Sequence, residues 1–155
     1  MTSIAPVVKE VSVNASAEHA FKVFTDGIDR WWPRQHHIGQ SPLKTEVLET
    51  KLDGRWYGVS EDGSECDIGK VLVWEPPTRL VLSWQLTAEW KFDPNFLTEI
   101  EVTFTAEGPR KTKVVVEHRK LDAYGPAAPA IREMIGADSG WGLIVDNFAA
   151  AANGE

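Results

Sequence analysis

Six short runs of alternating apolar and polar residues, separated by turn-forming residues, occupy positions 43–120. Asp53-Gly54 and Asp62-Gly63 are strong signals for tight hairpin turns, and the segments EPPT and EGPRK mark two further turns. Strands joined by such short connections pair with their neighbours in antiparallel fashion. The sequence therefore predicts an antiparallel meander, with strands in LKTEVLETKL, RWYGVS, SECDIGKVLVW, RLVLSWQL, FLTEIEVTFT and KTKVVVEHRK.

Alternate side chains of a strand lie on the same face of a sheet. Three of the predicted strands carry an inward set at every second position: Leu80, Leu82, Trp84 and Leu86, then Ile100, Val102 and Phe104, then Val114, Val116 and His118. The residues between them are mostly charged, and we expect Glu99, Glu101, Lys113 and Glu117 to face water. One face of the sheet is thus predicted to be buried, with His118 on it.

One strand and two short helices are predicted before the meander. The alternating valines of Val7–Val13 indicate a strand, and Ser16 is a good N-cap for a helix in SAEHAFKVFTDG. Ile28, Trp31 and Trp32 have the spacing of one helical face, and the proline that follows them ends this second helix.

The C-terminal segment GWGLIVDNFAAAAN predicts an amphipathic helix. Its broad apolar stripe needs a large apolar surface to lie on, and consists of Trp141, Ile144, Val145, Phe148 and Ala152. The concave face of the curved sheet is the surface of that size. We therefore predict an α+β fold, a single domain over residues 1–155, in which the sheet wraps around the C-terminal helix.

Composition excludes several classes of function. The formal net charge of −7 and the scattered lysines and arginines oppose binding to nucleic acid. No long apolar segment suggests membrane insertion, and the N-terminus lacks a secretory pattern, so we expect a cytoplasmic protein. Cys66 is the only cysteine, which excludes an intramolecular disulfide and a cysteine-rich metal site.

Three segments of the chain are distinctive: ASAEHAFKVFTDGIDRWWP, the G-x-V-L-x-W-E-P-P-x-R-L segment from Gly69 to Leu80, and the helix start at Gly140 and Trp141. They resemble the heat-shock-protein ATPase activator homologue branch of the START-like, or SRPBCC, superfamily. The resemblance implies the helix-grip fold, with an elongated apolar cavity between the C-terminal helix and the sheet. Relatives bind lipids, polyketides or hormones, and a few catalyse cyclisation. A polyketide-cyclase-like enzyme and a chaperone-interacting module are therefore the alternatives to simple ligand binding.

The inward aromatic residues make a candidate binding site for a small apolar or aromatic molecule, without a cofactor. We expect its residues to be Trp32, Trp56, Trp74, Trp84, Phe104, His118, Trp141, Val145 and Phe148. Such bulky rings can line a cavity or fill it, and both readings stay open at this point.

Among titratable residues, His118 is the candidate general base, because burial would keep its ring neutral. The alternative is a core histidine that is hydrogen-bonded in place. Glu65 and Asp67 share a strand face and could form a pair of catalytic acids, although such pairs are usually solvated. His36 and His37 alone supply too few ligands for a metal ion, and no metal site is expected.

Overall fold

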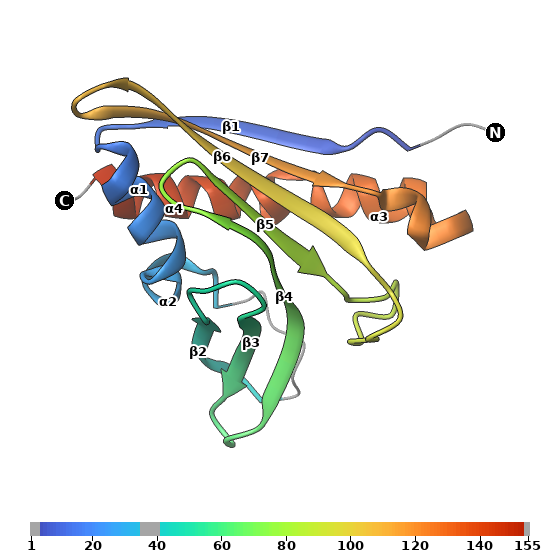
Figure 1. Cartoon of the computed structure of the whole chain (residues 1–155). Coiled ribbons are helices and arrows are strands. Elements are labelled where there is room, and N and C mark those ends of the chain that lie inside the picture. Colours follow the sequence, from blue (N-terminus) through green and yellow to red (C-terminus); the bar gives the residue numbers. More distant parts are fainter. Residues whose placement is uncertain (1–3, 35–40, 154–155) are drawn as a thin grey trace.

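A seven-stranded antiparallel sheet organises the computed structural model, which describes residues 4–34 and 41–153 (Figure 1). The strands lie in the order β1-β7-β6-β5-β4-β3-β2. Their bounds are β1 Val7–Val13, β2 Leu43–Leu48, β3 Arg55–Ser60, β4 Glu65–Glu75, β5 Arg79–Trp84, β6 Thr98–Gly108 and β7 Lys111–Arg119. The predicted meander is confirmed, and the N-terminal strand pairs with its last member.

The helices occupy the two ends of the chain. They are α1 Ala17–Thr25, α2 Ile28–Trp31, the short helix η1 Leu121–Ala127, α3 Ala128–Ile135, the irregular turn η2 Asp138–Gly142, and α4 Leu143–Asn153. Ser16 caps α1 as predicted, because its hydroxyl oxygen accepts the backbone N–H of His19 at 3.1 Å. None of the described helices combines the length and the apolarity needed to cross a membrane.

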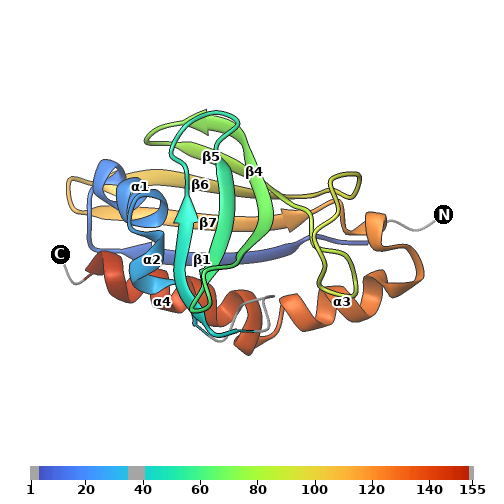
Figure 2. The ribbon, with the colours of Figure 1, turned by 90° about the horizontal axis from the view of Figure 1, so that it is seen from below.

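The sheet curls around the helices (Figures 1 and 2). Figure 2 shows α3 and α4 following one another along the side of the sheet formed by β1 and β7, with α1 and α2 near one end. Helix α4 contacts β1, α1 and α2. The whole predicted stripe is buried, namely Trp141, Ile144, Val145, Phe148 and Ala152. This arrangement is the α+β helix-grip fold that the sequence predicted.

Register shifts bend the part of the sheet that frames the site. Strand β4 changes register against β3 at Trp56/Tyr57 and against β5 at Val71/Val73. Such irregularities increase twist and bend a strand, and Figure 1 shows β4 as a long curved strand that turns away from β5 toward β2 and β3.

The outer face of the sheet carries charged residues, as expected. Arg79 lies 2.6 Å from Glu101, and Arg119 lies 3.1 Å from both Glu99 and Glu101. These ion pairs lie on the face opposite the apolar core, so Arg79 and Arg119 do not point toward the core.

Candidate functional site

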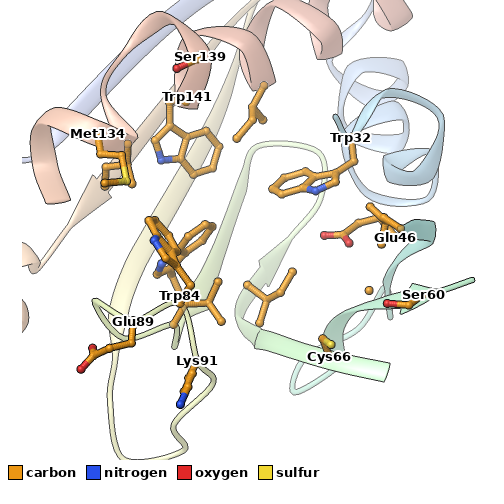
Figure 3. A pocket seen from close by; sticks show the side chains of 18 residues that line it. Trp32, Glu46, Ser60, Cys66, Trp84, Glu89, Lys91, Met134, Ser139 and Trp141 are labelled. Atoms are coloured by element: carbon orange, nitrogen blue, oxygen red, sulfur yellow. The ribbon is translucent and has the colours of Figure 1, made fainter. Parts of the chain in front are cut away.

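A cavity of about 490 Å³ lies between strands β2–β5 and the segment that joins α3 to α4. Its walls come from β2, β3, β4, the β5–β6 connection, α3, η2 and the first turn of α4. Figure 3 shows Trp84 and Trp141 on one side of this space and Trp32 and Glu46 on the other. The volume lies within the range typical of small-molecule sites, about 300–1,000 Å³.

Four tryptophans line the cavity: Trp32, Trp84, Trp90 and Trp141. The ring of Trp84 lies 6.4 Å, centroid to centroid, from those of Trp90 and Trp141. Trp56 was also predicted for the site, but it does not line the cavity. It lies behind the wall, where it packs edge to face against Trp32 at 5.6 Å and against Trp84 at 5.9 Å. Three of the four lining tryptophans were predicted; Trp90, on the β5–β6 connection, was not.

Hydrogen bonds hold these rings in fixed orientations. Trp84 Nε1 donates to the hydroxyl of Tyr124 at 3.1 Å, and that hydroxyl donates to the carbonyl of Leu86 at 2.7 Å. Trp141 Nε1 donates to His118 Nδ1 at 3.0 Å. Because each indole N–H is already satisfied inside the protein, the two rings present their apolar surfaces to the cavity.

His118 lies behind the cavity wall and does not line it. Its ring is fully buried, its Nδ1 accepts the Trp141 N–H, and its Nε2 lies 2.9 Å from Thr98 Oγ1. The Thr98 hydroxyl donates its own proton to the carbonyl of Trp84 at 2.9 Å, so the neutral His118 ring must carry its proton on Nε2.

The hydrogen bonds of His118 correct the interpretation of this residue as a general base in contact with a ligand. Burial lowers the pKa of His118 from 6.5 to about 3. A base needs a free nitrogen within reach of its substrate, and both ring nitrogens are occupied inside the wall. The alternative reading, a core histidine that is hydrogen-bonded in place, describes this geometry.

Four other predicted site residues also lie outside this cavity. Trp74 packs against Phe21 at 5.1 Å, and Phe104 and Phe148 pack against Phe24 at 5.9 and 5.2 Å. Val145 is buried on α4 as part of the hydrophobic core. The tryptophans and phenylalanines therefore do both things that the sequence left open: they line one end of the interior and fill the other. Phe104, Val145 and Phe148 are buried away from the cavity, and Trp74 is half-buried beside a separate surface hollow of about 300 Å³. The assignment of these four residues to the site is therefore corrected.

Glu46 is the polar residue that sequence reasoning missed. It lies on β2, is only 2% exposed, and lines the cavity. Figure 3 shows its carboxyl group directed into the space between the tryptophans. Its Oε2 accepts the indole N–H of Trp56 at 2.9 Å, and its backbone N–H donates to Asp29 Oδ1 at 2.9 Å. A signal was present, because Glu46 alternates with Leu48 on the buried face of its strand.

A glycine makes room for this carboxyl group. Gly58 lies on β3 opposite Glu46, and a Cβ atom at Gly58 would come within 3.1 Å of Glu46 Oε1 and 2.9 Å of Leu43 Cδ1. Both values are shorter than ordinary van der Waals contact. The absence of a side chain at Gly58 thus allows Glu46 to lie against the neighbouring strand.

Burial changes the acid strength of Glu46. Removal from water raises its pKa from 4.5 to about 8, against the hydrogen bond from Trp56 and the charge of Arg34, which lower it, while the charge of Asp29 adds to the rise. Arg34 is itself paired with Asp29 at 2.7 Å, so its charge is largely matched. Near neutral pH most of the Glu46 side chains are therefore protonated and uncharged, and a smaller fraction is ionised.

With Trp56 donating to Oε2, the protonated form of Glu46 carries its hydrogen on Oε1. A protonated carboxyl group is a hydrogen-bond donor. The cavity therefore combines flat apolar walls with one buried donor, which can bind a carbonyl or quinone oxygen, or take a proton after ionisation.

Strand β4 contributes Cys66 to the cavity, and burial raises the pKa of this thiol. Its neighbours Glu65 and Asp67 point away to the surface, where Arg55 lies 3.0 Å from Glu65 and 2.8 Å from Asp67. The two acids thus form an exposed ion-pair cluster, which corrects their interpretation as possible catalytic acids.

Within residues 4–34 and 41–153, no three His, Cys, Asp or Glu side chains gather closely enough to hold a metal ion. His36 and His37 lie outside the described residues.

Comparison with solved structures gives the same fold throughout the chain. The anthrahydroquino-gamma-pyrone synthase Txn09, solved in complex with SUM, is 34% identical, with 97% of this chain and 99% of that chain covered and a TM-score of 0.68. The self-sacrificing resistance protein CalC from Micromonospora echinospora is 33% identical, with 97% and 95% covered and a TM-score of 0.72.

A third structure, the Aha1 dimer from Colwellia psychrerythraea, shares the fold with a TM-score of 0.63, 14% identity, and coverage of 97% of each chain. No curated protein matches the sequence. The model of the family described as "Activator of Hsp90 ATPase homolog 1-like protein" matches residues 14–153. The chain therefore belongs to this family, the Hsp90 ATPase activator homologue branch of the START-like superfamily.

Proposed function

We propose that this protein binds a flat aromatic small molecule in the cavity between β2–β5 and the α3–α4 segment. One observation carries the proposal: a space of about 490 Å³ has tryptophan walls and a single buried carboxyl group. Small-molecule sites are mostly apolar and hold a few polar groups that orient the ligand. Fused aromatic rings fit such a site better than a flexible lipid chain, because the walls are rigid and flat.

The polar contact in this binding mode comes from Glu46. Its protonated carboxyl group donates to an acceptor on the ligand, such as a quinone or ketone oxygen, while the ring system packs against Trp84 and Trp141. One relative supports this ligand class: Txn09, which is 34% identical to this chain, is named as a synthase of an anthrahydroquino-gamma-pyrone.

Quinizarin, a three-ring hydroxyquinone, tests the proposal. We expect it to quench the tryptophan fluorescence of the protein in a saturable manner, with the affinity checked by calorimetry. The variant Cys66→Trp should abolish binding, because it adds a large ring to a half-buried side chain of the cavity wall. The matched variant Cys66→Ser should bind normally. Equal binding to both variants, or none to the wild type, would contradict the proposal.

A chaperone-binding role finds less support among the described residues. Their exposed large apolar side chains are Val8, Leu52, Phe92 and Met134, which belong to four different segments. No single described element therefore presents a broad apolar docking face.

A further inference from the structure

We propose that Glu46 is a proton-transfer catalyst, so that the cavity deprotonates an activated C–H group of an aromatic carbonyl or imine substrate. This inference rests on the proposed function, because the substrate must occupy the same cavity. It goes further in assigning a reaction to the site and a catalytic group to the reaction.

The first argument is position. Glu46 is buried and directed into the cavity, whereas the other carboxylate of the wall, Glu89, is exposed to solvent on the β5–β6 connection. The Trp56 hydrogen bond at 2.9 Å fixes Oε2, and the contact of the Glu46 backbone N–H with Asp29 fixes the strand beneath it. Oε1 therefore has a defined position, as a catalytic base requires.

The second argument is the charge around this carboxyl group. The described groups that act on it are Arg34 and Asp29, which pair with each other at 2.7 Å beside α2, and the uncharged Trp56 on β3. Across the cavity, β4 contributes the Cys66 thiol, and the β5–β6 connection contributes Glu89 and Lys91, both exposed. No described cation lies within salt-bridge distance of Glu46, so its ionised form keeps its basicity.

The third argument is that the pKa of Glu46 suits a general base that works near neutral pH. A general base works best when its pKa is close to the operating pH, and burial raises that of Glu46 to about 8. The ionised carboxylate in an apolar, aromatic surrounding is poorly hydrated, which makes it a stronger base toward carbon than an exposed carboxylate. His118 offers no competing base, because both of its ring nitrogens are hydrogen-bonded.

The reaction balances without an oxidant or a further reactant. The carboxylate of Glu46 takes the proton from a carbon next to a carbonyl group, the C–H electron pair forms a C=C bond, and the carbonyl π pair moves to oxygen. The resulting enolate takes up a proton, from Glu46 or from water, on oxygen or on another carbon. The class of reaction is therefore tautomerisation, and any ring closure that begins with such an enolate.

Nitrobenzisoxazole, a flat bicyclic compound, is the test substrate. A base removes the proton from its ring carbon, the C–H pair forms the third bond of a nitrile, and the N–O bond breaks with its pair on oxygen. The product is a yellow cyano-nitrophenolate, so that turnover is followed by absorbance. We expect the wild-type rate to rise with pH through a midpoint near the pKa of Glu46, about 8.

The variant Glu46→Gln keeps the shape of the side chain and an acceptor for Trp56, and it should lower the rate by about 100-fold or more. Glu117→Gln is the control, since it removes a carboxylate from the outer face of β7 and should retain the wild-type rate. A rate that is unchanged in Glu46→Gln, or a pH profile without the rise, would overturn the inference.

Binding of nitrobenzotriazole, an unreactive analogue of similar shape, is measured in parallel by tryptophan fluorescence. Binding without Glu46-dependent turnover would overturn the catalytic inference and leave the proposed binding function standing. If neither quinizarin nor nitrobenzotriazole bound, both proposals would fail.

Discussion

At the scale of single residues, the site depends on the close approach of Glu46 to Gly58. A Cβ at Gly58 would lie 3.1 Å from Glu46 Oε1, so Gly58→Ala should displace the carboxyl group. Misplacement of a catalytic group by a fraction of an ångström is costly, and we expect turnover of nitrobenzisoxazole to fall by at least about tenfold. The control is Gly108→Ala, whose added Cβ meets no atom within 4 Å. Equal rates in the two variants would show that the carboxyl group has room to move.

His118 is predicted to stabilise the fold and the orientation of the Trp141 ring, without contacting a ligand. In His118→Ala the indole N–H of Trp141 loses its buried acceptor, and a cavity replaces the imidazole ring. We expect a loss of about 2–4 kcal/mol in the free energy of unfolding, measured by urea denaturation. In His118→Asn the amide oxygen can still accept from Trp141, so the loss should be smaller. His118→Asn should still bind quinizarin, because it retains the acceptor for Trp141; a folded His118→Asn variant that no longer binds would favour a direct role in the site.

At the scale of elements, the β5–β6 connection forms one wall of the cavity. The backbone N–H of Thr87 donates to the carbonyl of Lys91, and that of Asp93 donates to the carbonyl of Gln85, both at 2.9 Å. These contacts hold Trp90 against Trp84 although its backbone has a φ of 62°, in the left-handed region that side chains rarely adopt. Residues retained in such conformations often serve a site.

Replacement of this tryptophan separates its two roles. In Trp90→Gly the backbone strain disappears, so the melting temperature should stay within a few degrees of the wild type, while the cavity loses part of its wall. We expect quinizarin affinity to fall by about threefold to tenfold, the value of one aromatic contact. Asp53→Gly is the control: it relieves a φ of 65° in the turn between β2 and β3, outside the cavity, and should leave affinity unchanged.

The elements were more predictable than the cavity. Alternation of apolar residues and the Asp-Gly turns determine the strands of the meander locally, and Ser16 determines the start of α1 in the same way. The cavity depends on the bend of β4 and on the distance between β2 and the α3–α4 segment, which no local pattern encodes. Phe104 and Trp84 alternate on inward faces in the same manner, yet one fills the closed end and the other lines the cavity.

Glu46 could have been identified from the sequence by a search for charged residues on the buried faces of the predicted strands. A glutamate on the apolar face of a predicted strand is unusual and calls for an explanation, since buried carboxyl groups are costly unless they are neutral or paired. Its partner was not predictable, because the Trp56 N–H reaches it across the β2–β3 pairing.

At the scale of the whole molecule, one end of the interior is filled and the other is open. Phe24, Trp31 and Phe148, from α1, α2 and α4, pack together with ring centroids 5.0–5.5 Å apart. The close packing in this filled end stabilises the fold, whereas side chains that line an open cavity bury less apolar surface. Apolar burial in this part of the core offsets the unfavourable free energy of burying the Glu46 and His118 side chains.

These two buried groups give the whole molecule a distinctive dependence of stability on pH. The pKa of His118 is lower in the folded protein, about 3 against 6.5, so its contribution is present above pH 6.5 and is lost as the pH falls toward 3. The pKa of Glu46 is higher in the folded protein, about 8 against 4.5, so its contribution is present below pH 4.5 and is lost as the pH rises toward 8. Between 4.5 and 6.5 the two slopes oppose each other, which predicts a plateau there and a fall toward pH 8.

Urea denaturation of the wild type, Glu46→Gln and His118→Asn at a series of pH values separates the two contributions. The slope of each cannot exceed about 1.4 kcal/mol per pH unit, the limit for one proton. Subtraction of the Glu46→Gln profile from that of the wild type should leave a curve that falls from pH 4.5 to about 8. Parallel profiles would mean that Glu46 ionises normally in the folded protein. It would then be charged at neutral pH and could not donate a hydrogen bond to a ligand, so the same measurement bears on the binding mode as well as on stability.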